Sequence, residues 1–116
     1  MKLDHDLTRQ MLLHIEEITD GNNGYPAAGF AASFPEYAPG VVRYHIKYLM
    51  DAALVEHNNS EIYDISPKGR DCLDSIRNPE NWKQTKATVA KRALGQLSFD
   101  VMVEIAKGLI LKSFNL

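Results

Sequence analysis

The chain has 116 residues, of which 45% are hydrophobic and 24% are charged, and its formal net charge is −2 at pH 7. This composition is ordinary for a globular protein and argues against disordered, collagen-like and coiled-coil chains. The single cysteine cannot form an intramolecular disulfide, and no apolar run approaches the length that crosses a bilayer. We therefore expect a cytoplasmic protein without a secretion signal or a membrane segment.

The first half of the sequence predicts a helix, an irregular connector and a second helix. Apolar residues at helical spacing predict the first helix over about residues 4–18. Turn residues over 21–26 and three prolines leave room for at most a short helix before residue 39. Pro39 favours the start of a helix over about 39–53, whose apolar stripe is Val42, Ile46, Leu49 and Ala53.

The next segment predicts a β-hairpin. Two short runs that favour strands, 54–57 and 61–65, flank the polar turn 58–60. A hairpin directly after an amphipathic helix suggests a wing.

The remaining sequence predicts three helices. Ser66-Pro67 and Asn78-Pro79 each supply an N-cap followed by proline, so we expect helices over about 67–77 and 79–93. Gly95 interrupts the pattern, and a last apolar stripe over 99–114 follows the candidate cap Ser98.

Together these elements predict a mainly α (α+β) fold. The order helix, connector, helix, hairpin is that of a winged helix-turn-helix over residues 1–66 with a two-strand wing. A helical C-terminal extension over 67–116 would pack on the same core. Residues 42–55 resemble the recognition helix of small winged-helix repressors, where a YHL-x-x-L-x-x-AGL core is usual. Ala53 stands where those families mostly have glycine, which tolerates a positive φ that alanine resists.

A second resemblance extends over nearly the whole chain. Its residues are Lys2, Asp4, Asp6, Leu7, Arg9, Leu12, Leu13, Tyr44, His45, Leu49, Leu54, Gly69, Leu73, Asp74, Ile76, Arg77, Trp82, Thr85, Lys86, Ser98, Phe99, Ala106 and Lys107. On these residues the chain resembles an uncharacterised family of bacteria and their phages that is grouped as a domain of unknown function. The resemblance implies a winged-helix fold and a phage or prophage context, and it implies no activity.

The predicted helix over 39–53 is a candidate DNA reader, because residues 39–50 contain two basic residues and no acidic residue. Arg43 can read guanine through paired donors, while Lys47, Tyr44 and Tyr48 favour phosphate oxygens. The alternative is a solvated helix face. The turn over 58–61 supplies no lysine or arginine to the DNA backbone, which favours that alternative.

A second basic segment is a candidate auxiliary phosphate surface. It consists of Lys83, Lys86, Lys91 and Arg92, with no acidic residue between positions 81 and 99. About four phosphate contacts in all would give a log–log salt slope of roughly −3.6. The alternative is again a solvated face.

The last predicted helix carries an apolar line beside its main stripe. We predict a homodimer interface made by Val101, Ile105, Leu109 and Leu111, since a C2 dimer would suit two operator half-sites. The alternative is that this helix is buried within the core of the monomer.

The titratable residues do not form a recognisable catalytic or metal-binding pattern. His5, His14, His45 and His57 lack regular ligand spacing, and the sequence has no phosphate loop, nucleophile elbow or zinc-helix motif. We expect no enzymatic activity, metal or cofactor. We expect His45 to form hydrogen bonds within the domain and Cys72 to be a small buried apolar residue.

From the sequence we expect a phage- or prophage-type regulator that binds double-stranded DNA, as a homodimer. The alternative is a winged-helix module that binds a host or phage protein and does not bind DNA.

Overall fold

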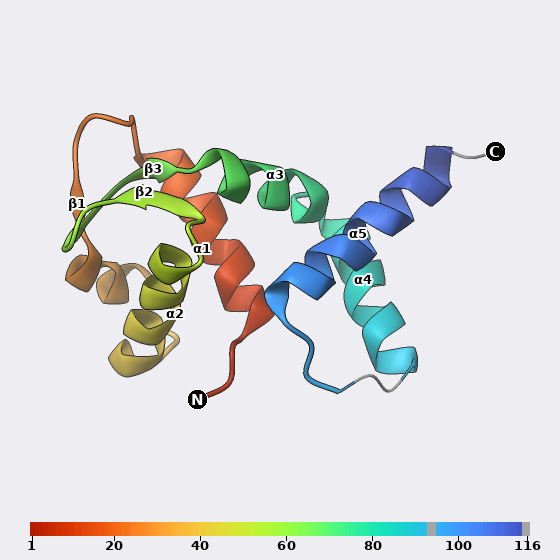
Figure 1. Ribbon diagram of the computed structural model, residues 1–116. Helices are drawn as coiled ribbons and strands as arrows, with labels where there is room; N and C mark the ends of the chain where they lie inside the picture. Colours follow the sequence, from red (N-terminus) through yellow and green to blue (C-terminus); the bar gives the residue numbers. More distant parts are fainter. Residues whose placement is uncertain (93–94, 115–116) are drawn as a thin grey trace. The chain divides into compact units, whose positions relative to one another are not determined.

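The computed structural model describes residues 1–92 and 95–114 (Figure 1). The chain forms two compact units, Met1–Arg70 and Asp71–Leu116. The fold is mainly helical with a small three-stranded antiparallel sheet, which lies in the first unit. Among the described residues, no helix is long and apolar enough to cross a membrane.

Helix α1 spans His5–Ile18 and begins at a side-chain cap. The carboxylate of Asp4 accepts a hydrogen bond from the backbone N–H of Leu7, which satisfies one of the donors left open at a helix start. Leu7, Met11 and Ile15 are buried, as their helical spacing predicts. The predicted first helix is therefore confirmed.

The connector after α1 contains a strand that the sequence analysis missed. Strand β1 (Tyr25–Pro26) is followed by a 3-10 helix, η1 (Ala27–Ser33), where at most a short helix was predicted. The hairpin predicted as a two-strand wing is therefore part of a three-stranded sheet, because β1 pairs with β3. Two residues are too short to show an alternating pattern, and proline is tolerated in this strand because β1 lies at the sheet edge.

Helix α2 spans Pro39–Asp51 and buries Val42, His45, Ile46 and Leu49. The ring of His45 is 1% exposed. Its Nε2 accepts the backbone N–H of Asp4 at 2.8 Å, so the ring is neutral and its Nδ1–H donates to the carbonyl of Val41, also at 2.8 Å. The expected hydrogen bonds of His45 within the domain are confirmed.

Helix α2 ends two residues earlier than predicted, in a Schellman motif. The N–H of Leu54 donates to the carbonyl of Leu49, and the N–H of Ala53 donates to that of Met50. Ala53 is exposed and has a φ of 59°, the left-handed conformation that glycine normally occupies. Its predicted place on the apolar stripe is therefore wrong.

Strands β2 (Val55–His57) and β3 (Glu61–Ile65) form the predicted hairpin, and the sheet order is β1-β3-β2. Val55 pairs with Ile65, and the register shifts between Glu56 and His57. In the turn, the side-chain oxygen of Asn58 accepts the N–H groups of Ser60 and Glu61. Asn58 therefore holds the turn with its own side chain.

Helices α3 (Pro67–Ile76), α4 (Pro79–Lys91) and α5 (Phe99–Phe114) complete the fold, and the unit boundary falls within α3. The hydroxyls of Ser66 and Ser98 and the amide oxygen of Asn78 accept N–H groups at the three helix starts, as predicted. The predicted end of α4, residue 93, lies outside the described residues.

Within the second unit, α4 packs against α5. The Asn81 amide donates to the carbonyl of Ser75 at 2.8 Å and lies 3.4 Å from that of Ala106. Lys107 forms an ion pair with Asp71 at 2.8 Å. Cys72 is buried, as expected.

Gly69 allows the first turn of α3 to lie directly on the chain that enters β2. A Cβ atom at this position would lie 1.9 Å from the carbonyl oxygen of Leu54, which also accepts the N–H of Ser66. Only glycine fits without a backbone shift.

We predict that Gly69→Ala lowers the free energy of unfolding by about 1–3 kcal/mol, because either α3 or the Leu54 carbonyl must move. Gly29→Ala is the matched control, since a Cβ there would meet no atom within 4 Å. Urea unfolding followed by circular dichroism measures both variants. Equal stability of the two variants would contradict the close approach.

We predict the opposite sign for Ala53→Gly, which should raise the free energy of unfolding by about 0.5–1 kcal/mol. The relief of the left-handed alanine exceeds the backbone entropy that glycine adds to the unfolded chain. The same urea titration tests this change, and a loss of stability would show that Ala53 does not adopt the left-handed conformation.

Candidate functional site

The outer face of α2 carries the residues predicted to read DNA. Because Val42, His45, Ile46 and Leu49 point inward, Arg43, Tyr44 and Lys47 are exposed and Tyr48 is half-buried. The structure therefore brings all four predicted α2 residues to one side of this helix.

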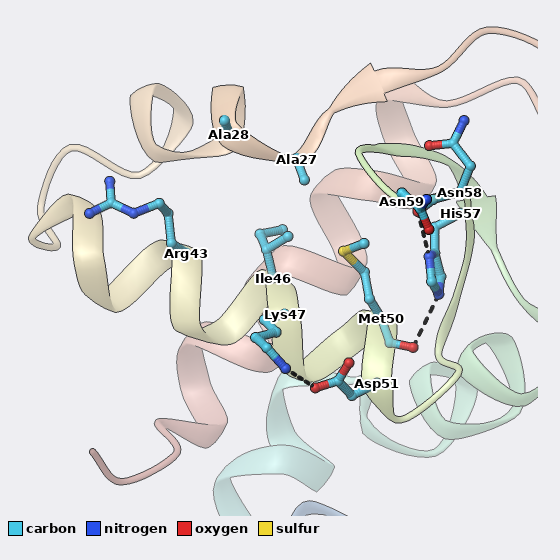
Figure 2. A pocket seen from close by; sticks show the side chains of 10 residues that line it. All are labelled: Ala27, Ala28, Arg43, Ile46, Lys47, Met50, Asp51, His57, Asn58 and Asn59. Atoms are coloured by element: carbon cyan, nitrogen blue, oxygen red, sulfur yellow. Dashed lines mark hydrogen bonds and ion pairs between the residues drawn. The ribbon is translucent and has the colours of Figure 1, made fainter.

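A groove of about 500 Å³ runs along α2 within the first unit. One wall comes from the start of η1 and another from the tip of the hairpin, as Figure 2 shows. Its lining residues are Ala27, Ala28, Arg43, Ile46, Lys47, Met50, Asp51, His57, Asn58 and Asn59.

The groove has chemically different ends. Arg43 lies at one end, and the amides of Asn58 and Asn59 lie at the other, with Ile46 and Met50 between them (Figure 2). Among residues 1–92 and 95–114, Arg43 has no ion-pair partner. Its planar guanidinium is therefore available to a carboxylate, a phosphate or a base edge.

Lys47 is held by a neighbour on the same helix. Its Nζ lies 2.5 Å from Oδ2 of Asp51, one turn further along α2, and both side chains are exposed. The hydrogen bond to Asp51 raises the pKa of Lys47, so the lysine stays protonated at neutral pH. Its charge is nevertheless offset by an adjacent carboxylate, and any anionic ligand must compete with Asp51.

A second hollow of about 240 Å³ lies on the other side of Lys47 and is lined by Tyr44, Lys47, Tyr48 and Asp51. The Tyr44 ring packs edge-to-face on His45, with ring centroids 5.5 Å apart. The rings of Tyr44 and Tyr48 therefore both border Lys47, which is the arrangement that the predicted contacts with DNA phosphates require.

The hairpin tip is fixed to the end of α2. His57 places Nε2 3.2 Å from the carbonyl of Met50 and Nδ1 2.8 Å from that of Asn58. The Asn58 amide donates to the hydroxyl of Tyr63 at 2.9 Å. Desolvation, together with the nearby carboxylate of Glu61, raises the pKa of Tyr63, so its hydroxyl stays protonated.

Sequence reasoning did not place η1 or the hairpin tip beside α2. Ala27, Ala28 and Met50 carry no functional signal of their own, and His57 was considered only as a metal ligand or a catalytic residue. The available signal was the short connection between α2 and β2, which keeps the hairpin close to the end of α2.

The residues of the predicted auxiliary phosphate surface lie in the second unit, three on α4 and one directly after it, and all are exposed: Lys83, Lys86, Lys91 and Arg92. They do not share one face. At 3.6 residues per turn, Arg92 points about 180° away from Lys83. Lys86 also places its Nζ 5.9 Å from the centre of the Trp82 ring.

The four predicted dimer residues lie on α5 and differ in exposure. Val101 is 43% exposed and Leu111 64%, whereas Ile105 and Leu109 are half-buried. Within the part of the chain that the structure describes, no group of three or more His, Cys, Asp or Glu side chains is placed to hold a metal ion.

Comparisons with known proteins identify a family and no activity. Residues 2–95 match the family described as "Hypothetical protein (DUF2513)". An uncharacterized protein of Haemophilus influenzae is 30% identical over 118 residues, which cover 95% of this chain and 96% of the relative. No solved structure matches the chain. The expected resemblance to an uncharacterised family is therefore confirmed, and the chain belongs to the DUF2513 family.

Proposed function

We propose that this protein is a winged-helix regulator that binds double-stranded DNA through the outer face of α2. The element order α1, β1, η1, α2, β2, β3 and the sheet order β1-β3-β2 support the winged-helix assignment. In this assignment η1 and α2 form the helix-turn-helix, α2 is the recognition helix, and the β2–β3 hairpin is the wing.

The observation that carries the proposal is the placement of Arg43 and Lys47. They lie one turn apart on the exposed side of α2 and line the same groove. A recognition helix enters the major groove with such a face, where an arginine can donate two hydrogen bonds to guanine and a lysine binds phosphate. The net charge of −2 does not oppose this role, because the local field governs binding.

The same surface predicts a shallow salt dependence. The wing tip supplies amides and no cation, since residues 58–61 contain no lysine or arginine. If α2 provides about two charged contacts, the log–log salt slope is about −1.8. If the basic residues of α4 added about two more, the slope would approach −3.6. A slope of about −3.6 would therefore require phosphate contacts beyond the two cations of α2.

A protein partner is the second candidate. It is favoured by the pairing of Lys47 with Asp51, which offsets one of the two cations on α2. Glu56 and Glu61 also flank the wing tip, where they would repel phosphates. A groove with an apolar centre and amides at one end would then accept a polypeptide segment.

The first test is a salt titration of binding to mixed-sequence duplex DNA, measured by fluorescence anisotropy. We expect affinity to fall as salt rises, and we expect Arg43→Ala/Lys47→Ala to weaken binding at least about tenfold, since each contact contributes on the order of 1 kcal/mol or more.

The matched control for this variant is Lys83→Ala/Lys86→Ala, which removes the same formal charge from α4 and should change affinity less than about threefold. No binding by the unmodified chain at low salt would contradict DNA recognition. Equal losses in the two variants would contradict recognition by α2 alone.

A second prediction follows from the ion pair on α2. Asp51→Asn should raise affinity for duplex DNA by about two- to fivefold, because it frees Lys47 and removes a negative charge beside the bound phosphate. The gain should shrink as salt rises. Unchanged or weaker binding at low salt would show that Lys47 does not contact DNA. Circular dichroism would confirm that the variant keeps its fold.

A further inference from the structure

Helix α5 has one side buried and one side exposed. Phe99, Met102, Val103 and Ala106 are buried. The opposite side, at about 100° per residue, carries Val101, Glu104, Ile105, Gly108, Leu111 and Lys112. We call these six residues the outer face of α5. All are exposed except Ile105, which is half-buried.

Gly108 lies at the middle of the outer face. A Cβ at this position would meet no atom within 4 Å, so the surface above the glycine is open. Glycine weakens a helix interior by up to about 1 kcal/mol relative to alanine. An exposed glycine in mid-helix therefore contributes nothing to the helix itself, but it allows another backbone to approach closely.

The residues around Gly108 are arranged symmetrically. Ile105 and Leu111, three residues before and after it, are both apolar. Glu104 and Lys112, four residues before and after it, carry opposite charges. Lys112 has no ion-pair partner among the described residues, and Glu104 has a contact of 3.8 Å with Lys107.

This arrangement selects one orientation for a second copy of the chain. In an antiparallel pair with its two-fold axis at Gly108, Glu104 lies level with Lys112 of the partner subunit, and the symmetry repeats the contact. In a parallel pair, Glu104 would face its own copy, and like charges repel.

We propose that the outer face of α5 is the interface of an antiparallel homodimer in which the helices cross at Gly108. Val101, Ile105 and Leu111 then lose exposure to water on both sides of the crossing. Leu109, which the sequence analysis included in the interface, lies about 100° from Gly108 around the helix and has no place in this contact.

The proposal is tested by the dimer dissociation constant of the full chain, measured by sedimentation equilibrium. Glu104→Lys and Lys112→Glu should each raise the constant at least about tenfold, because each change turns two attractions per dimer into repulsions. The double variant restores both contacts and should return to within about threefold of the unmodified chain.

Two further variants distinguish disruption of the interface from an unspecific effect of substitutions on α5. Gly108→Gln should abolish the dimer, since it blocks the close crossing, while a Cβ at this position meets no atom of the monomer within 4 Å. Phe114→Ala is the control, because Phe114 is 78% exposed but lies off the outer face, and it should leave the constant unchanged. Circular dichroism confirms that each variant folds.

A chain that stays monomeric at millimolar concentration would overturn the proposal. So would a double variant whose dissociation constant stays as high as those of the single charge variants. A dimer that is disrupted by Phe114→Ala but not by the charge variants would also overturn it. The measurement contains no DNA, so it stands independently of the function proposed for α2.

Discussion

The hydrogen bonds of the buried His45 ring fix the orientation of α2. Its Nε2 accepts the N–H of Asp4, which is also the cap of α1, and its Nδ1–H donates to the carbonyl of Val41. A buried ring that lost either partner would carry an unsatisfied polar group, at a cost of about 1–3 kcal/mol. Since His45 must point inward, the helical period places Arg43 and Lys47 on the outside. The buried His45, together with Val42, Ile46 and Leu49, thus determines which residues α2 presents to a ligand.

The C-terminal end of α2 and the start of α3 position the β2–β3 hairpin, whose tip forms one wall of the groove. The Schellman motif at Ala53 turns the chain sharply into β2, and Gly69 lets α3 lie on the carbonyl of Leu54. The hydroxyl of Ser66 donates to the carbonyl of Ala53 at 2.6 Å, which joins the two ends of the hairpin. These contacts bring His57 to the end of α2. This wall of the groove therefore depends on the left-handed backbone at Ala53 and on the absence of a side chain at Gly69.

The sequence predicted the helices well, because each has a local signal. Proline and a polar cap stand at the starts of α3 and α4, and apolar spacing marks α1 and α2. It could not predict β1, which has two residues and exists only through its pairing with β3. For the same reason the groove was missed, since η1 and the hairpin tip meet α2 only in the folded chain. The i, i+4 spacing of Lys47 and Asp51 is enough to predict their ion pair. The prediction left this carboxylate out because Asp51 lies one residue beyond the acid-free segment 39–50.

The proposed role of α2 is tested most directly by nuclear magnetic resonance of the ¹⁵N-labelled chain titrated with a mixed-sequence duplex at low salt. If α2 reads DNA, the amide signals of residues 39–51 should shift together with those at the start of η1 and at the hairpin tip, since these segments line one groove. Shifts confined to α4, or no shifts at all, would contradict the account.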